Sequence, residues 1–201
     1  MSDTGIFWIR DDFRLEDNPA LSFATQNHES VIALFIYNNK NFDNQTEAQK
    51  WWVSKSLEAF KKDLSKYNIN LQIVKGDELD IFSKIKKKDN LSIYWNKVYE
   101  PDVINTGKKI RDIFLKNEIN FKYFKGNILN EFQDVTKNDG TPFKVFTPFW
   151  RTAEQKYLSQ PPSKNYIVKK KTKEKTFFKN YIEPKNILPQ KDWYKKFDKY
   201  W

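Results

Sequence analysis

Apolar residues along the chain occur in short runs that alternate with longer segments in which apolar positions recur every three or four residues. The short runs are typical of buried strands, and the longer segments are typical of amphipathic helices. Strands are predicted over residues 5–10, 30–37, 70–76, 91–96 and 120–126, and helices over residues 18–26, 47–66, 77–88 and 101–118. Asn18 is a candidate N-cap, with Pro19 at the first helical position.

This alternation predicts an α/β fold, because strands separated by helices pair in parallel through right-handed crossovers. We expect a doubly wound, Rossmann-like, five-stranded parallel sheet in residues 1–127. The alternation then stops. Residues 128–158 are expected to form an extension that packs on the sheet domain and contains a helix from Pro148 to Leu158, and residues 159–201 to form a weakly held linker.

Charge separates the last segment from the rest. The net charge is +10, and residues 159–201 hold twelve Lys against four acids. Such a tail could bind phosphates or an anionic membrane, but a solvated linker is the simpler interpretation. Its aromatics leave apolar surface with nothing further in this chain to cover it: Trp193, Tyr194, Phe197, Tyr200 and Trp201.

Composition also excludes several kinds of chemistry. The chain has no Cys and one His, so disulfides, thiol catalysis and a multi-His metal site are excluded, and no metal site is predicted. His28 is expected in a solvated loop. No apolar stretch is long enough to span a membrane and no signal-peptide pattern begins the chain, so a cytoplasmic location is expected.

The usual catalytic and phosphate-binding motifs are missing. With five Gly, the chain has neither a P-loop nor a GxGxxG turn. Its carboxylates show no spacing diagnostic of an acid/base pair, so no catalytic residue is predicted. Spacing alone indicates an α/β domain whose ligand lies at the carboxyl ends of the strands, near Arg10–Asp12, Tyr37–Asn39, Gly76–Asp77 and Asn96–Glu100. Arg is rare beside 32 Lys, and its four positions are candidates for forked donors: Arg10, Arg14, Arg111 and Arg151.

The stretch WIRDDFRLEDNPAL, residues 8–21, resembles the N-terminal signature of the DNA photolyase and cryptochrome family. WWVSKSLEAFKKDL, YWNKVYEPDVINTGKKIRD and KVFTPFW also resemble family segments, in the family's order. The resemblance implies the N-terminal α/β domain of a deoxyribodipyrimidine photolyase, which can hold an antenna chromophore. It also implies that FAD, dimer splitting and contact with damaged DNA belong to a C-terminal helical domain that this chain lacks, joined in cis or as a split partner. The chain alone is then expected to be inactive. The alternatives are a cryptochrome-type photoreceptor fragment and a stand-alone binding module.

The resemblance also implies site residues. A folate, deazaflavin or flavin antenna is expected at the carboxyl edge of the sheet, although Val98 and Val103 depart from the deazaflavin and folate patterns. The residues expected to bind it are Tyr37, Asn38, Trp51, Lys55, Asn96 and Glu100. The loop after the first strand is expected to be locked by guanidinium–carboxylate pairs among Arg10, Asp12, Arg14 and Asp17, which either serve only as scaffold or also touch a ligand.

Overall fold

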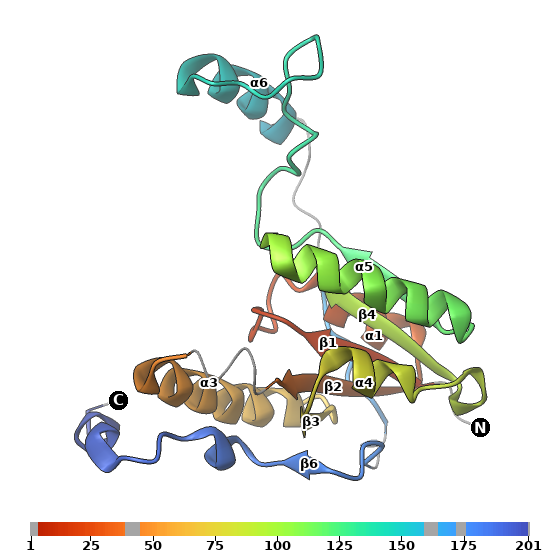
Figure 1. The fold of residues 1–201 in the computed structure, drawn as a ribbon, viewed down its shortest axis with the longest axis vertical. Helices are drawn as coiled ribbons and strands as arrows, with labels where there is room; N and C mark the ends of the chain where they lie inside the picture. The colour runs from red at the N-terminus through yellow and green to blue at the C-terminus, as the bar shows by residue number, and fades with distance from the viewer. Residues whose placement is uncertain (1–3, 39–44, 159–164, 172–175, 201) are drawn as a thin grey trace.

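A six-stranded sheet forms the centre of the computed structural model, which describes residues 4–38, 45–158, 165–171 and 176–200 (Figure 1). Its strands are β1 (Thr4–Ile9), β2 (Ser30–Tyr37), β3 (Asn70–Lys75), β4 (Leu91–Asn96), β5 (Asn120–Phe124) and β6 (Tyr181–Ile182), in the order β5-β4-β1-β2-β3-β6. β1 to β5 pair in parallel, and β6 pairs antiparallel with β3. The predicted doubly wound parallel sheet is confirmed, and β6 adds an edge strand that the sequence did not predict.

Helices cover both faces of the sheet. The helices are α1 (Pro19–Asn27), α3 (Glu47–Ser65), α4 (Glu78–Ser83), α5 (Pro101–Lys116), α6 (Phe146–Leu158) and α7 (Lys195–Asp198), with 3-10 turns η1 (Lys87–Asp89), η2 (Pro184–Ile187) and η3 (Asp192–Tyr194). One core cluster joins β1, β2 and β3 to α1 and α3, and a second joins the strands to α4 and α5. Because strand side chains alternate, Phe7 and Ile9 enter the first cluster and Ile6 and Trp8 the second.

Local signals fix where the helices begin. Asn18 caps α1 by accepting a hydrogen bond from the Leu21 amide, with Pro19 at the first helical position, as predicted. Thr46 and Gln49 form a reciprocal capping box at the start of α3. α4 ends at Ser83, earlier than the predicted residue 88, and the chain then turns through η1 into β4. None of the helices in the described ranges is long and apolar enough to cross a membrane.

The prediction that His28 lies in a solvated loop is wrong. Its side chain is buried, and its Nε2 lies 2.6 Å from the hydroxyl of Tyr94. Gly5 makes room for the ring, because a Cβ at that position would come within 2.8 Å of the imidazole. A polar neighbourhood in sequence therefore concealed a core histidine whose Nε2 is hydrogen-bonded to the Tyr94 hydroxyl.

The segment after residue 164 crosses the body as a strap, by which we mean residues 165–200 as far as they are described. Its first part lies along α1: Ser22 Oγ donates to the Tyr166 carbonyl at 2.8 Å, and the Val168 amide donates to Thr25 Oγ1 at 3.2 Å. Lys170 is buried, and its amine donates to the carbonyls of Thr25 and His28 at 2.5 and 2.7 Å. These hydrogen bonds hold the first part of the strap against α1, whereas the sequence predicted a weakly held linker.

The later part of the strap is held by β3 and α3. Gln72 Oε1 accepts hydrogen bonds from the amides of Phe177 and Phe178, and β6 pairs with β3. Farther along, Ser54 Oγ donates to the Pro184 carbonyl at 2.9 Å. The division of the chain at residues 127 and 158 stays a prediction, but the described strap residues belong to the body. The predicted role of Trp201 lies outside the described residues.

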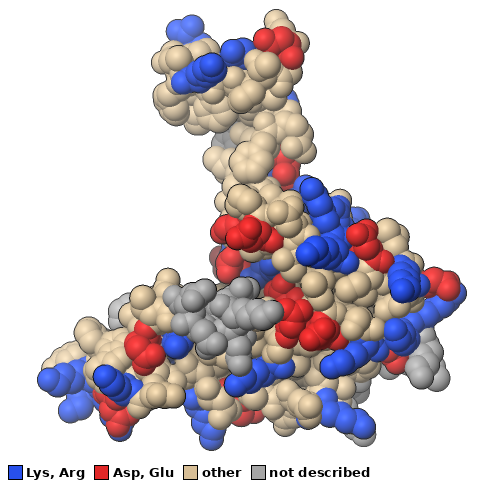
Figure 2. Space-filling view, in the orientation of Figure 1, with Lys and Arg blue, Asp and Glu red and all other residues tan. Residues whose placement is uncertain are grey.

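Residues 135–158, which we call the arm, project from the body, whereas the strap crosses it. Figure 1 shows α6 standing well apart from the sheet, joined to it by a narrow connection. At its base, the Lys156 amine donates to the Asp134 carbonyl. In the space-filling view the arm is a separate knob above the body (Figure 2).

Candidate functional site

The loop after β1 is held by a buried polar cluster at the carboxyl edge of the sheet. Asp12 accepts from the Arg10 amide at 3.0 Å and from Asn96 Nδ2 at 2.5 Å. Asn96 also donates to Asn18 Oδ1 at 2.8 Å and accepts from the Ala20 amide at 3.1 Å. Burial raises the pKa of Asp12, and the hydrogen bonds from Asn96 and the Arg10 amide oppose that shift. Asn96, predicted to bind a cofactor, therefore uses both of its amide atoms to join β4, the loop and α1.

The charged loop is locked differently from the expected pairing of guanidinium with carboxylate. Arg14 Nε and Nη2 donate to the backbone carbonyl of Asp17 at 3.2 and 3.1 Å, and Nη1 donates to Asn127 Oδ1 at 3.1 Å. Asp17 has a φ of 47°. The guanidinium thus secures a left-handed turn and connects it to the segment after β5.

Arg10 is the central charge of this edge. Its guanidinium lies 4.1 Å from the centroid of the Trp8 ring. Burial raises the pKa of Asp11, with Arg10 opposing the shift and Glu100 adding to it. Burial likewise raises the pKa of Glu78, again opposed by Arg10. These shifts place one cation among several carboxylates at the strand ends.

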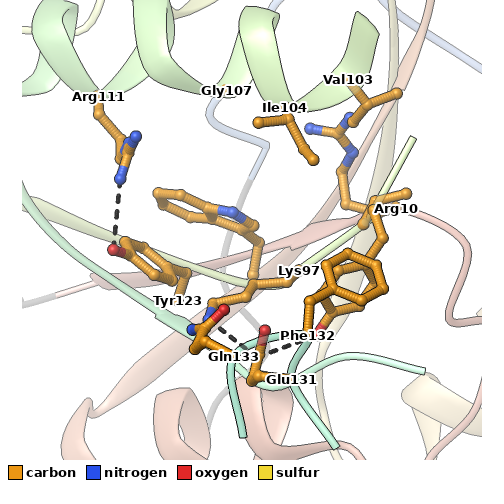
Figure 3. A pocket seen from close by; sticks show the side chains of 13 residues that line it. Arg10, Lys97, Val103, Ile104, Gly107, Arg111, Tyr123, Glu131, Phe132 and Gln133 are labelled. Atoms are coloured by element: carbon orange, nitrogen blue, oxygen red, sulfur yellow. Dashed lines mark hydrogen bonds and ion pairs between the residues drawn. The ribbon is translucent and has the colours of Figure 1, made fainter. Parts of the chain in front are cut away.

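A pocket of about 300 Å³ opens beside Arg10, between the ends of β4 and β5 and helix α5 (Figure 3). Its aromatic and apolar walls come from Trp95, Val98, Tyr99, Val103, Ile104, Tyr123 and Phe132, and its charged side chains are Arg10, Lys97, Arg111 and Glu131. Arg111 Nη1 donates to the Tyr123 hydroxyl at 3.3 Å. The pocket combines flat aromatic surface with two guanidinium groups, which suits a planar ligand that carries negative charge.

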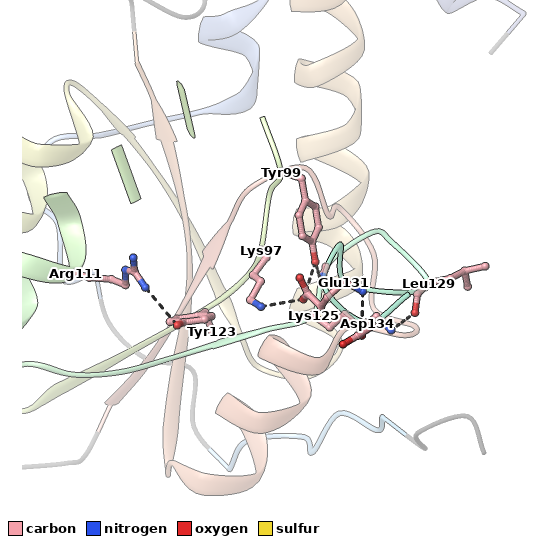
Figure 4. A network of polar contacts seen from close by, with 9 residues as sticks. Lys97, Tyr99, Arg111, Tyr123, Lys125, Leu129, Glu131 and Asp134 are labelled. Carbon is pink, nitrogen blue, oxygen red and sulfur yellow. Dashed lines mark hydrogen bonds and ion pairs between the residues drawn. The ribbon is translucent and has the colours of Figure 1, made fainter. Parts of the chain in front are cut away.

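A small polar network fixes one wall of the pocket (Figure 4). Glu131 Oε1 accepts from Lys97 Nζ at 2.9 Å and from the Tyr99 hydroxyl at 3.1 Å. Burial opposes the charge of Lys97, but its bond to Glu131 raises the pKa of the lysine. For Tyr99, in contrast, burial is the main reason that the pKa is raised. Because Lys97 is paired with Glu131, the guanidinium groups of Arg10 and Arg111 are the cations better placed to meet a ligand.

Gly126 allows this wall to close. A Cβ at this position would lie 2.0 Å from the carbonyl oxygen of Lys97, which no side chain tolerates. Its amide donates to the Tyr99 hydroxyl at 3.3 Å. The close approach of these backbones brings the segment after β5 against the end of β4.

The other predicted binding residues lie elsewhere. Tyr37 and Asn38 are half-buried at the end of β2, and Asn39 lies outside the described residues. Trp51 and Lys55 face the end of the strap: Trp51 Nε1 and Lys55 Nζ both reach Asp198 Oδ1 at 3.1 Å. Glu100 is exposed at the start of α5. The structure therefore brings none of Tyr37, Trp51 and Lys55 into the lined pocket, and their role in binding stays a prediction.

Sequence reasoning missed most of the pocket but contained two signals for it. Two of the four Arg residues, Arg10 and Arg111, line it. Val98 and Val103, noted as departures from the family's antenna patterns, line it as well. The part played by Glu131 and Phe132 could not be anticipated, because they lie beyond the predicted sheet domain and reach the site through a loop.

Comparisons with known proteins agree with this architecture. The DNA photolyase family model matches residues 5–166. A deoxyribodipyrimidine photo-lyase of Agrobacterium fabrum is 29% identical over 98% of this chain, which spans 41% of that protein. Cryptochrome-1 of Arabidopsis thaliana is 28% identical over 78% of this chain and 23% of its own length.

A solved structure gives the same assignment. The class III photolyase of Agrobacterium tumefaciens superposes with a TM-score of 0.79 at 27% identity, over 100% of this chain and 42% of that protein. This chain thus spans about two fifths of the photolyases that it matches, and it corresponds to their N-terminal region. The family model matches most of the chain, and the sheet has the α/β fold that the N-terminal signature led us to expect. The chain therefore belongs to the DNA photolyase family.

Proposed function

We propose that this chain is the light-harvesting N-terminal domain of a DNA photolyase and that the pocket beside Arg10 holds its antenna chromophore. The observation that carries the proposal is the lining of the pocket: aromatic rings from Trp95, Tyr123 and Phe132 lie together with two guanidinium groups. A volume of about 300 Å³ lies at the lower end of the range for ligand sites, which suits a ring system whose tail remains in the open.

The residues present fit a folate, a deazaflavin or a flavin, all of which are planar and carry anionic groups. When bound, such a group absorbs light and passes the excitation on. The chain's own residues would bind and orient the ring. Tyr123 offers a face for stacking, Arg111 is held by the Tyr123 hydroxyl, and the Lys97–Glu131 pair keeps the opposite wall in place.

The reaction of the whole protein is part of the same proposal. In it, a C-terminal helical domain, in cis or as a separate chain, carries FAD and splits cyclobutane pyrimidine dimers by light-driven electron transfer. Support comes from the photolyase of Agrobacterium fabrum and from the class III photolyase structure, which match 98% and 100% of this chain at 29% and 27% identity. We therefore propose a photolyase rather than a photoreceptor.

The test is retention of a chromophore by the purified chain. It is incubated separately with a folate, a deazaflavin and FMN, desalted, and read by absorbance in the near-ultraviolet and blue. We expect the chain to retain one of the three compounds. Arg111→Gln should lower the affinity for that compound about tenfold or more, because a hydrogen bond to a charged group contributes about 1.5–3 kcal/mol. Lys109→Gln, an exposed α5 substitution outside the pocket lining, is the matched control.

A second variant distinguishes the pocket from the predicted alternative on α3. Lys55→Ala leaves the pocket lining intact, so it should not change retention if the pocket is the site. Loss of retention in Lys55→Ala but not in Arg111→Gln would move the site to the α3 side of the edge. Retention of none of the three compounds would contradict the antenna role.

A further inference from the structure

The second half of the strap, residues 176–200, has an inner and an outer face. Four of its side chains are buried: Pro184, Ile187, Pro189 and Tyr194. The lysines of this segment all lie at exposed positions: Lys179, Lys185, Lys191, Lys195, Lys196 and Lys199. In Figure 2, Lys and Arg side chains recur along the lower margin of the molecule, where Figure 1 places the strap. The strap therefore packs apolar residues on the body and turns its charge outward.

The acidic residues of this segment leave most of that charge unpaired. Each of the three forms an ion pair with a lysine: Glu183 with Lys61, Asp192 with Lys195 and Asp198 with Lys55. Two of these three lysines belong to α3 and not to the strap. Within the described residues, five strap lysines therefore form no ion pair: Lys179, Lys185, Lys191, Lys196 and Lys199. Such an array of cations favours a partner that carries many negative charges.

Exposed aromatic rings stand beside these lysines. Tyr181, Trp193 and Phe197 are 48, 37 and 54% exposed, and each lies one or two positions from an exposed lysine. The Trp193 ring rests on Trp51 of α3, with centroids 6.4 Å apart, so its position is fixed while part of it stays in solvent. Lysines for a phosphate backbone and aromatic rings for stacking bases are the two elements of surfaces that bind single-stranded nucleic acid.

The array is also held in place before any partner binds. A solvated linker is the simpler interpretation of the sequence, but the structure fixes this segment on the body. β6 pairs with β3, Gln72 accepts from the amides of Phe177 and Phe178, and Ser54 donates to the Pro184 carbonyl. Because the backbone is ordered in advance, binding does not have to order it, which favours affinity.

We propose that the outer face of residues 176–200 binds single-stranded DNA. The inference goes beyond the antenna role and takes from the proposed function only the choice of DNA, on which the whole protein is proposed to act. The family resemblance assigns contact with damaged DNA to a C-terminal domain, so this contact is an additional one. A single strand suits the surface better than a duplex, because its bases are free to stack on the rings.

An anionic membrane fits this surface less well. Proteins that lie on a membrane usually do so through an amphipathic helix with a large apolar face. The strap is mostly extended here, and its helix α7 has only four residues.

The test is fluorescence anisotropy of a labelled oligo(dT) of about 20 nucleotides, titrated with the 201-residue chain between about 50 and 200 mM salt. If each of the five unpaired lysines meets one phosphate, log affinity should fall with log salt with a slope of about −3.5. The double substitution Lys185→Gln and Lys191→Gln should reduce the steepness of that slope by about 1.4 and weaken binding about tenfold or more at 50 mM salt. The matched control, Lys108→Gln with Lys109→Gln on exposed positions of α5, removes the same charge and should leave the slope within about 0.3 of the unmodified value.

Tyr181→Thr tests the aromatic rings and keeps a residue type that suits strand β6. It should weaken binding of oligo(dT) about tenfold and leave the salt slope unchanged, because it removes a stacking surface and no charge. Tyr166→Thr is its control, since Tyr166 is a strap residue that is 63% exposed but lies beside α1. It should change the affinity less than about twofold.

Circular dichroism shows whether each variant keeps the fold. Two results with oligo(dT) would overturn the proposal: no binding at about 100 μM chain in 50 mM salt, or binding that the Lys185 and Lys191 double variant leaves unchanged. Binding to phosphatidylglycerol vesicles without binding to oligo(dT) would make the partner a membrane, and binding of oligo(U) at least about tenfold tighter would make it RNA. Chromophore retention is read by absorbance without DNA, so its failure and the failure of this inference are distinguishable.

Discussion

The arm and the strap are two aromatic, lysine-containing segments that follow the same sheet, yet they relate to it in opposite ways. The strap crosses α1, β3 and α3 and is bonded to each of them. The arm stands apart, with most of its described side chains exposed (Figure 1). Because both segments contain large apolar residues, hydrophobic content alone does not decide which of them is bound to the body.

What distinguishes them is the supply of backbone and polar partners. β3 has an open edge that β6 can join, Gln72 presents an acceptor to two strap amides, and the end of α1 presents carbonyls to Lys170. Beside α6, the described residues supply a partner at the base of the arm, where the Asp134 carbonyl accepts from the Lys156 amine, but they supply no strand edge. A segment that satisfies its polar groups on the body can be held without a large apolar contact, whereas an apolar stripe without them must find its cover elsewhere.

The largest expected effect in this comparison comes from Lys170→Met. The substitution keeps an unbranched side chain but leaves the buried carbonyls of Thr25 and His28 without their donor. Burial lowers the pKa of Lys170, and its two hydrogen bonds help to hold the first part of the strap. We expect the free energy of unfolding in urea to fall by about 2 kcal/mol, as for two buried acceptors losing their partner.

Lys171→Met is the matched control for that variant, because Lys171 is the exposed neighbour of Lys170 in the same segment of the strap. It should unfold within about 0.5 kcal/mol of the unmodified chain. Limited proteolysis adds a local measurement: in Lys170→Met, cleavage near residues 165–171 should accelerate, while α3 stays intact. Equal free energies of unfolding for the two variants would mean that the strap, like the arm, contributes little to the stability of the body.

The central sheet was predictable from sequence because its signals are local. Runs of buried apolar residues, the Asn18–Pro19 start of α1 and the alternation of strands with helices all act within a few residues. Strand β6 was missed because Tyr181–Ile182 is only two residues long and pairs with a distant strand: Ile182 lies opposite Ile73, 109 positions earlier in the chain. No local periodicity distinguishes such a strand from a linker.

The candidate site was predictable only to its edge of the sheet. Topology placed the functional edge at the carboxyl ends of the strands, where Arg10 and the pocket lie. It could not say which half of that edge is hollow, because this depends on the loop that brings Glu131 and Phe132 against Lys97 and Tyr99. Nor could it foresee that Trp51 and Lys55 would be engaged by Asp198.

A smaller effect is expected at the end of the strap when pH is lowered. Burial tends to raise the pKa of Asp198, but hydrogen bonds from Lys55 and Trp51 outweigh it and hold that pKa below its ordinary value of 3.8. A carboxyl group with a lowered folded-state pKa stabilises the fold above its unfolded pKa, and that contribution is lost as pH falls through the folded value. The contact between α7 and α3 should therefore weaken below about pH 4.

The Trp51 indole N–H, which donates to Asp198, is the reporter for this change. In the unmodified chain, the NMR signal of this indole N–H should shift with pH, with a midpoint below pH 3.8. In Asp198→Asn the titration should disappear, while the indole signal of Trp95, in the core, serves as the internal reference. A Trp51 signal that titrates equally in both proteins would show that another group controls it.

The smallest effect should come from the arm. Phe146→Ser removes a ring that is 71% exposed and stacks on Trp150, so little buried surface is lost. We expect the free energy of unfolding of the isolated chain to change by less than about 0.5 kcal/mol. Phe82→Ser, the same substitution at a fully buried position, should cost about 3–5 kcal/mol and shows what a packed ring contributes. Urea unfolding monitored by circular dichroism measures both. If Phe146→Ser destabilised the chain nearly as much as Phe82→Ser, the arm would be packed on the body in solution, and the contrast with the strap would not hold.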